Sequence, residues 1–368
     1  MKQVYVFAIA LIALVGCNSP KQEAVVDTTV EMDSVFCNRL LPELGGGVTG
    51  ADGAISIDLK DGRSMFMWGD SFFGDVVDDV RQPPVAFMMG NVFTTIDDKE
   101  IKNYYQGTAQ APRSYIEPDS TGNTPTWYWP GHGFVKDGVL YLFMSKFNKE
   151  GDGPFGFAYE RCDYFILDAK TLKVLTKTNF PAANENGVHY GHAVLEDGKY
   201  IYVYGTLSDN KAFTADVHVA RCIVENNALA NFEFWDGSNW QSDAKKSQKI
   251  AGITQAVSEQ FNVVKLHDKY ILVTQDRFKN VKDIYSFTSD KPQGPFGNEK
   301  LIYTINEPNY ETDSMMTYNT MVHPQYIKND KVLMCYNVNT YDMEKVWVKA
   351  SVYRPRFFWM PISNMIKE

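Results

Sequence analysis

Two aspartates lie at equal distances on either side of a predicted turn. Asp52 stands nine residues before Asp61, and Asp70 stands nine residues after it. Asp61-Gly62 between two apolar runs predicts a hairpin, whose strand pairing would bring Asp52 and Asp70 side by side. Adjacent carboxyl groups in a buried pocket have separated pKa values, as a general acid and a base require, and glycosidic bond hydrolysis uses such a pair. The alternative, a turn cap and a strand end without a shared task, stays open.

Glu259 and Arg277 form the same mirrored pair, nine residues before and after Asp268. The plainest prediction is a structural ion pair. Glu259 is otherwise a candidate third catalytic carboxylate, and the pair is a candidate for orienting sugar hydroxyls.

Three histidines, His132, His192 and His323, precede other predicted turns by five, five and seven residues. Gly131 and Gly191 allow a ligand to approach the backbone beside the first two. We expect these histidines to bind a sugar by hydrogen bonds, since they lack the fixed local spacing of a metal site. The sequence therefore predicts no metal and no other cofactor, although metal binding by these histidines is the less favoured alternative, and an ion such as calcium in a central channel stays open.

A repeated hairpin must position these residues. An apolar strand, an Asp turn and a second apolar strand recur five times, and the turn residues are Asp61-Gly62, Asp137-Gly138, Asp197-Gly198, Asp268-Lys269 and Asp330-Lys331. The spacings between successive turns, of 76, 60, 71 and 62 residues, each accommodate a four-stranded antiparallel sheet. No long segment has helical periodicity, which disfavours a parallel α/β fold.

We therefore predict an all-β fold, a single five-bladed β-propeller of residues 36–368, with residues 346–353 as a strand that completes the last blade. Two β-sandwich domains are the alternative. In a propeller the first strands of the blades line the central channel, so the polar ends of all five hairpins should meet at one mouth. Trp129, two residues after Trp127, is expected there as a stacking platform for a sugar, or else in the core.

The charge of the chain restricts its partners. The 368 residues carry 36 basic and 45 acidic side chains, for a formal net charge of -9. Duplex nucleic acid and anionic lipid surfaces attract basic proteins, so we expect neither as a partner. The expected partner is a carbohydrate, bound by a monomer.

The N-terminus predicts a lipid anchor. Lys2 precedes an apolar run from Val4 to Val15, which is too short for a membrane span. Leu14-Val15-Gly16-Cys17 resembles the lipobox of bacterial lipoproteins, in which the cysteine is acylated. This resemblance implies a signal peptide at 1–16, an acylated Cys17 and flexible tether at 17–35, and a location in the bacterial cell envelope, lipid-anchored to the outer membrane on either face.

The remaining cysteines, at 37, 162, 222 and 335, have neither CxxC nor Cys/His ligand spacing. A zinc or dithiol site is therefore unsupported, and the sequence does not decide whether they form disulfides.

Short motifs resemble a large bacterial family of five-bladed propellers, listed as domains of unknown function or glycosidases, that includes endo-D-arabinanases. They are Gly50-Ala51-Asp52-Gly53, Trp68-Gly69-Asp70-Ser71-Phe72, His189-Tyr190-Gly191-His192, Tyr318-Asn319 with His323-Pro324, and Tyr336-Asn337-Val338-Asn339. The resemblance covers nearly the whole mature chain. It implies that Asp52 and Asp70 are the catalytic pair, and it adds Tyr318 and Asn337 to the candidate sugar-binding residues.

The leading hypothesis is a glycoside hydrolase acting on a poly- or oligosaccharide, with arabinofuranosyl units among the candidates. The same mouth could also belong to a glycan-binding lipoprotein without catalysis. A polysaccharide lyase is a weaker alternative, because it would need a basic cleft for uronate.

Overall fold

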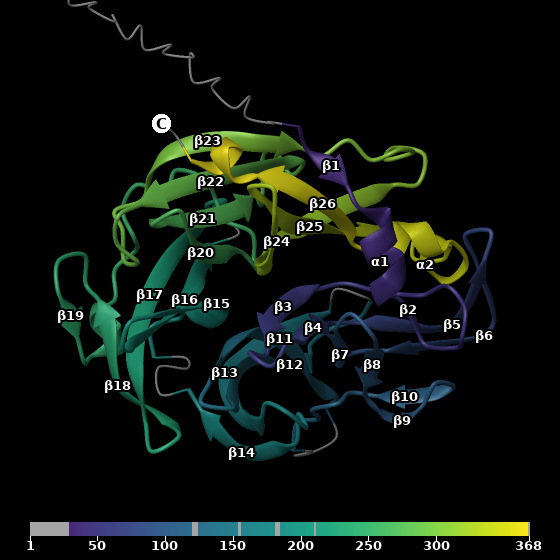
Figure 1. The fold of residues 1–368 in the computed structure, drawn as a ribbon, viewed down its shortest axis with the longest axis horizontal. Coiled ribbons are helices and arrows are strands. Elements are labelled where there is room, and N and C mark those ends of the chain that lie inside the picture. The colour runs from purple at the N-terminus through teal and green to yellow at the C-terminus, as the bar shows by residue number, and fades with distance from the viewer. Residues whose placement is uncertain (1–28, 120–123, 154–155, 181–184, 210, 367–368) are drawn as a thin grey trace, which may run out of the picture.

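The fold consists almost entirely of antiparallel sheets arranged around a common centre (Figure 1). The computed structural model describes residues 29–119, 124–153, 156–180, 185–209 and 211–366. Within these ranges, no helix is both long and apolar enough to cross a membrane.

Five sheets of four or five strands make up most of the described chain. The first contains β3 (Ile55–Asp58), β4 (Ser64–Trp68), β7 (Val92–Ile96) and β8 (Ile101–Tyr104). The second contains β11 (Thr126–Lys136), β12 (Val139–Lys149), β13 (Phe157–Asp168) and β14 (Val174–Asn179). The third contains β15 (His189–Asp197), β16 (Tyr200–Asp209), β17 (Thr214–Glu225), β18 (Ala228–Trp235) and β19 (Trp240–Gln241).

The fourth sheet contains β20 (Asn262–Leu266), β21 (Lys269–Gln275), β22 (Asp283–Ser289) and β23 (Gly297–Thr304). The fifth contains β24 (Met315–Lys328), β25 (Lys331–Thr340), β26 (Arg356–Pro361) and β1 (Glu31–Met32). Two smaller sheets are formed by β2 (Val48–Ala51) with β5 (Ser71–Val77) and β6 (Val80–Met88), and by β9 (Gln106–Thr108) with β10 (Ala111–Arg113). The short helices are α1 (Ser34–Leu40), α2 (Lys345–Val348), α3 (Ile362–Met365), and the 3₁₀ turns η1 (Ala244–Lys246) and η2 (Ala350–Tyr353).

The five predicted hairpins are confirmed. In each of the five sheets the first two strands pair in antiparallel register on either side of an Asp turn. Asp137 and Gly138 both have positive φ, of 51° and 76°, as the tight turn between β11 and β12 requires. The first strands contact one another in the order β3, β11, β15, β20, β24 and back to β3. The hairpins therefore surround one axis.

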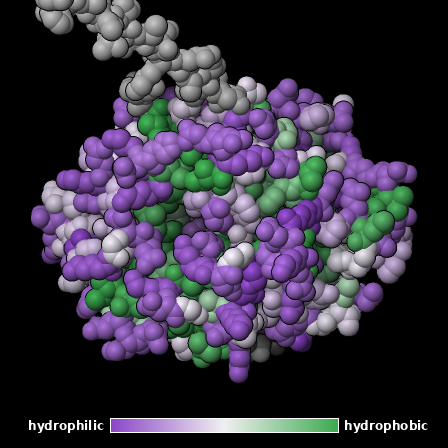
Figure 2. Space-filling view, viewed as in Figure 1, coloured by the Kyte–Doolittle hydropathy of each residue, from purple (hydrophilic) through white to green (hydrophobic). Residues whose placement is uncertain are grey.

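Apolar side chains pack between neighbouring sheets. In β21, Ile271 and Val273 pack with residues of the fifth sheet, whereas Leu272 packs with residues of the third. Successive side chains of a strand point to opposite faces, so a strand that is apolar at every position is covered on both sides. Figure 2 shows the molecule from the same side as Figure 1, with a mostly hydrophilic surface and separate apolar patches.

Two predicted boundaries need correction. The tether was expected to reach residue 35, but Glu31–Met32 pairs with β26, and Asp33 caps α1 by accepting the N–H of Phe36 at 2.9 Å. The folded region thus begins inside the predicted tether, and the N-terminal strand joins the last sheet.

The predicted strand at 346–353 is wrong, because α2 and η2 occupy this segment and β26 completes the sheet. Lys345 and Lys349, one helical turn apart, both bind the carboxylate of Asp313. That shared partner favours the helical conformation over an extended one.

Candidate active site

A cavity of about 680 Å³ opens where the hairpins end, opposite their Asp turns. Residues from all five larger sheets, or from the loops that flank them, line this mouth cavity. Of the predicted site residues it contains Asp52, Asp70, Trp129, His192, Glu259, Arg277 and Tyr318. Polar residues spaced along the sequence thus meet at one place, as the hairpin pattern predicts.

β-Bulges aim several of these side chains. The pairing register shifts between Pro130 and Gly133 in β11, between Tyr190 and Ala193 in β15, and in β24 just after Tyr318. A bulge leaves a residue unpaired and bends the strand, which redirects nearby side chains. Each bulge here lies at the mouth end of an innermost strand.

The Asp52 carboxylate is held by phenol and backbone donors. Tyr318 donates its hydroxyl to Oδ2 at 2.8 Å, and the hydroxyl of Tyr353 and the backbone N–H of Asp70 also hydrogen bond to it. Burial raises the pKa of Asp52, and these donors oppose the rise by favouring the ionised form. A Cβ on Gly69 would lie 2.5 Å from Asp52 Oδ1, so only glycine leaves room for this carboxylate.

Asp70 lies beside Asp52 and receives fewer hydrogen bonds that would stabilise a negative charge on its carboxylate. Its Oδ1 accepts hydrogen bonds from Trp129 Nε1 at 2.7 Å and from the Gly90 N–H at 3.1 Å. Burial, followed by the charge of Asp52, raises the pKa of Asp70 to about 7. The pair therefore combines a carboxyl group that holds its proton near neutral pH with a neighbour that receives more donors.

Glu259 forms the opposite kind of site. It accepts a hydrogen bond from His189 Nδ1 at 2.8 Å on Oε1 and pairs with Arg277 through Oε2. Burial acts to raise the pKa of Glu259, but the hydrogen bond from His189 and the nearby imidazole of His192 outweigh it and hold the pKa well below its ordinary range. The predicted ion pair is confirmed, and Glu259 is unsuited to be a general acid because it stays ionised.

Three predicted sugar-binding residues, His132, His323 and Asn337, are not among the residues that line the mouth cavity. His323 is fully buried, with Nδ1 2.7 Å from Ser56 Oγ and Nε2 3.3 Å from Cys335 Sγ. Asn337 donates to the backbone carbonyl of Asn319 at 3.0 Å.

His132 lies in the bulge of β11, where burial lowers its pKa to about 4. His132 and His192 lie within the bulges of β11 and β15, whereas His323 follows the first bulge of β24. His323 is therefore not structurally equivalent to the other two histidines. The structure therefore gives no support for sugar contact by His132, His323 and Asn337, since none of them lines the mouth cavity.

Apolar and aromatic side chains form much of the remaining wall. The Trp129 ring lies 4.5 Å from the ring of Phe147 and 4.8 Å from that of Phe157, measured between centroids. Trp347 also lines the cavity, and its ring lies 5.2 Å from that of Phe72. Aromatic faces beside acidic and amide groups suit a sugar ring, which presents C–H and hydroxyl groups together.

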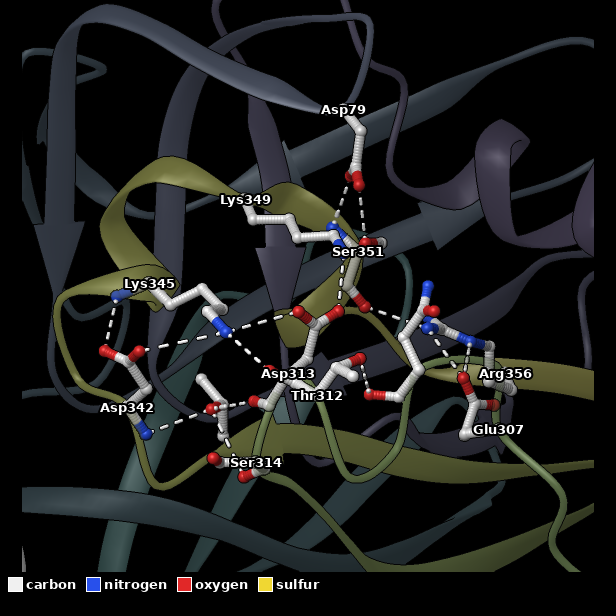
Figure 3. A network of polar contacts seen from close by, with 12 residues as sticks. Asp79, Glu307, Thr312, Asp313, Ser314, Asp342, Lys345, Lys349, Ser351 and Arg356 are labelled. Atoms are coloured by element: carbon white, nitrogen blue, oxygen red, sulfur yellow. Dashed lines mark hydrogen bonds and ion pairs between the residues drawn. The ribbon is translucent and has the colours of Figure 1, made fainter.

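A polar network fixes the C-terminal segment that carries Trp347 and Tyr353 to the cavity (Figure 3). Asp79 accepts both the N–H and the hydroxyl of Ser351, at 2.7 and 2.6 Å. Arg356 joins the Ser351 carbonyl to the carboxylate of Glu307. Together with the Asp313 lysine pairs, these contacts hold Tyr353 where it can reach Asp52.

Several cavity residues are absent from the sequence-based prediction. His189 begins the motif His189-Tyr190-Gly191-His192, and its spacing of three residues from His192 is a signal that could have identified it. Tyr353 and Trp347 were assigned to a strand, and no local pattern links them to Asp52. Ser145 and Tyr159 lie within long strands whose inward positions depend on register.

Residues 1–28 lie outside the described residues, so the prediction for Cys17 is untested. The four described cysteines are buried free thiols, at positions 37, 162, 222 and 335.

Comparisons with solved structures identify a similar fold. A protein from Bacteroides ovatus, described as a "putative hydrolase", is 19% identical with a TM-score of 0.73, over 90% of this chain and 89% of that chain. An endo-arabinase from Bacteroides thetaiotaomicron is 11% identical with a TM-score of 0.48, over 88% and 99%. A GH43_1 enzyme from Xanthomonas citri is 13% identical with a TM-score of 0.48, over 88% and 91%.

No curated protein matches the chain. A family model does, and it spans residues 38–361, from α1 to the end of β26. That range includes every residue of the mouth cavity, and the chain therefore belongs to the family described as domain of unknown function DUF5005.

Proposed function

We propose that this protein is a glycoside hydrolase built as a five-bladed β-propeller, in which the five larger sheets are the blades. Asp70 is the general acid and Asp52 the general base or nucleophile. The observation that carries the proposal is the adjacency of these two carboxyl groups in one cavity, with the pKa of Asp70 near 7. Glycosidic hydrolysis requires one carboxylic acid to protonate the leaving oxygen and one carboxylate opposite it.

The surroundings of the pair support these roles. Tyr318 and Tyr353 both donate to Asp52, so their hydrogen bonds favour its ionised form and orient the carboxylate before it accepts a proton or attacks the sugar. Burial and the neighbouring charge raise the pKa of Asp70 to about 7, so a large share of the molecules carry a proton on Asp70 near neutral pH, ready for the leaving group. Glu259, the predicted third carboxylate, instead holds Arg277 and the histidines on another wall of the cavity. The likeness in fold to the Bacteroides ovatus protein described as a hydrolase agrees with the proposal.

The substrate is a neutral poly- or oligosaccharide that stacks on Trp129 and Trp347. We place arabinofuranosyl polymers first among the candidates on the family resemblance. The test is release of reducing ends from arabinans, galactans and other plant and bacterial glycans by wild type, Asp52→Asn and Asp70→Asn. We expect both variants to lose release while they retain glycan binding. Binding without any release by wild type would instead identify a glycan-capturing protein.

We further propose that Cys17 carries a lipid that anchors the protein in the bacterial envelope. The proposal rests on the apolar run and the residues Leu14-Val15-Gly16-Cys17. Expression of wild type and Cys17→Ala in a bacterial host, followed by detergent phase partition, tests it. Wild type should enter the detergent phase and Cys17→Ala should not; equal partition would overturn the anchor.

A further inference from the structure

Two histidines and a glutamate converge on one wall of the mouth cavity. His189 Nδ1 lies 2.8 Å and His192 Nε2 lies 3.6 Å from the same oxygen of Glu259, Oε1. One ligand atom from each of the three residues lies within 4.8 Å of the other two. This spacing is close to the separation of donor atoms around a single metal ion, which holds nitrogen and oxygen ligands at about 2.0 to 2.2 Å, so small side-chain rotations would bring the three atoms to one ion.

His192 supplies an independent reason to expect a ligand. Its side chain is 3% exposed, and neither ring nitrogen has a hydrogen-bond partner among the described residues. A buried polar group without a partner costs about 1 to 3 kcal/mol, so native proteins rarely keep one without a task. Nε2 of His192 faces Glu259 Oε1, at a distance too long for a hydrogen bond.

Neighbouring residues orient the cluster. Ser145 Oγ lies 2.7 Å from His189 Nε2, so the second ring nitrogen of His189 is held while Nδ1 faces Glu259. Metal-bound histidines usually have such a partner on the other nitrogen. Gly191, at φ +94°, separates the two histidines by a tight turn, and a Cβ there would lie 2.8 Å from Phe143 Cβ. The glycine thus permits two histidines of one strand to reach the same point.

The donor atoms select the class of metal. Arg277 occupies Glu259 Oε2, which leaves one carboxylate oxygen and two imidazole nitrogens. Calcium prefers six to eight oxygen ligands and is disfavoured here. Two histidines with one carboxylate form a set typical of zinc sites that keep a position open for water or substrate.

We propose that His189, His192 and Glu259 bind a divalent transition metal, with zinc as the best-fitting ion and its open position facing the mouth cavity. This differs from the sequence-based prediction of no metal. The open position would take water or a hydroxyl group of a bound sugar. The proposal stands on the cluster alone and does not require the protein to cleave glycans.

Zinc titration of the purified, chelator-treated protein by calorimetry tests the proposal, with metal analysis after dialysis. We expect one zinc per chain in wild type and no calcium binding under the same conditions. Ser145→Ala removes a group that only orients His189, and such changes typically cost about 10- to 100-fold in metal affinity; His192→Gln and Glu259→Gln should each lose more than that. Circular dichroism checks that each variant folds.

His132→Gln is the matched control, because His132 lies at the equivalent bulge of β11 and also has an unpartnered Nδ1, yet is no part of the cluster. It should bind zinc as wild type does. No zinc binding by wild type, or unchanged binding by His192→Gln, would overturn the site and leave a hydrogen-bonded His–Glu–Arg network. Both results are independent of any hydrolytic assay, so they are distinguishable from failure of the proposed function.

Discussion

The first and fourth sheets place carboxylates at equivalent positions and give them opposite chemistry. Asp52 and Glu259 each precede the turn of their hairpin by nine residues, and Asp70 and Arg277 each follow it by nine. In the first sheet the mirrored partner is a second acid, and the pKa of Asp70 rises to about 7. In the fourth sheet the partner is Arg277, next to two histidines, and the pKa of Glu259 falls well below its ordinary range.

The position of a carboxylate in its hairpin brings it close to its partner side chain, whereas the charge of that partner determines whether the carboxylate is ionised. Both carboxylates experience burial, which by itself would raise either pKa. Asp70 has a neighbouring charge of the same sign, whereas Glu259 has donors and a cation. Four experiments test this contrast.

The largest expected effect is a difference in catalytic rate between a variant at Asp70 and a variant at Glu259. Asp70→Asn should lower kcat by about 10²- to 10⁴-fold, as expected for loss of a general acid. Glu259→Gln should act mainly on KM, because Glu259 stays ionised and cannot donate a proton. Steady-state kinetics on the best polymer of the panel measures both. Asp290→Asn, at an exposed ion pair with Lys269, is the control. A larger kcat loss in Glu259→Gln than in Asp70→Asn would reverse the assignment.

The next effect concerns stability. Glu259→Gln should lower the free energy of unfolding at pH 7 by about 1 kcal/mol, a modest value because the carboxylate is 37% exposed and partly screened. Since the pKa of Glu259 is depressed on folding, its contribution is present above the unfolded-state value and is lost as pH falls through the folded-state value. Urea unfolding at pH 7 and at pH 3 checks this. An equal difference at both pH values would contradict the linkage.

Asp70→Asn should stabilise the fold at high pH, an effect opposite in sign to that of Glu259→Gln. Asp70 has a pKa of about 7 in the folded protein against 3.8 in the reference state. Proton binding therefore stabilises the fold at low pH, and this contribution is lost as pH rises through 7. Asparagine removes the cost of the buried charge, so the melting temperature at pH 8 should rise by about 2 °C. Calorimetry at pH 8 and pH 5 measures the gain, which should shrink at the lower pH. A decrease at pH 8 would show that Asp70 has a structural role.

The smallest expected effect concerns the hydrogen bond by which Trp129 adjusts the pKa of Asp70. Trp129 donates a hydrogen bond to Asp70 Oδ1 and thereby lowers its pKa. Trp129→Phe removes the donor, so the alkaline limb of the kcat/KM profile should move to higher pH. Trp127→Phe, at a neighbouring indole that makes no hydrogen bond to Asp70, should leave the limb in place. A shift in the same direction for both variants would indicate a general effect of the aromatic wall.

Much of the site could be predicted by counting residues on either side of each hairpin turn. Counting from Asp61 and Asp268 placed four cavity residues correctly, because strand pairing fixes which positions lie opposite each other. The same counting misplaced His323, because bulges in β24 shift the register by an amount that the sequence does not show. Asn337, chosen on a motif, lies in the well-paired β25 but faces the backbone behind the cavity.

The β-rich architecture, the five hairpins and the pairing of Asp52 with Asp70 follow from the sequence, since turn chemistry and strand alternation are local properties. Other contacts depend on the complete fold: Tyr318 and Tyr353 hold Asp52, Glu307 and Asp313 anchor the C-terminal segment, and His189 joins His192 at Glu259. These contacts join residues that are far apart in the sequence. Hydrogen-bond partners separated by more than 250 residues, such as Asp52 and Tyr318, meet only when the first and last sheets close around a common axis.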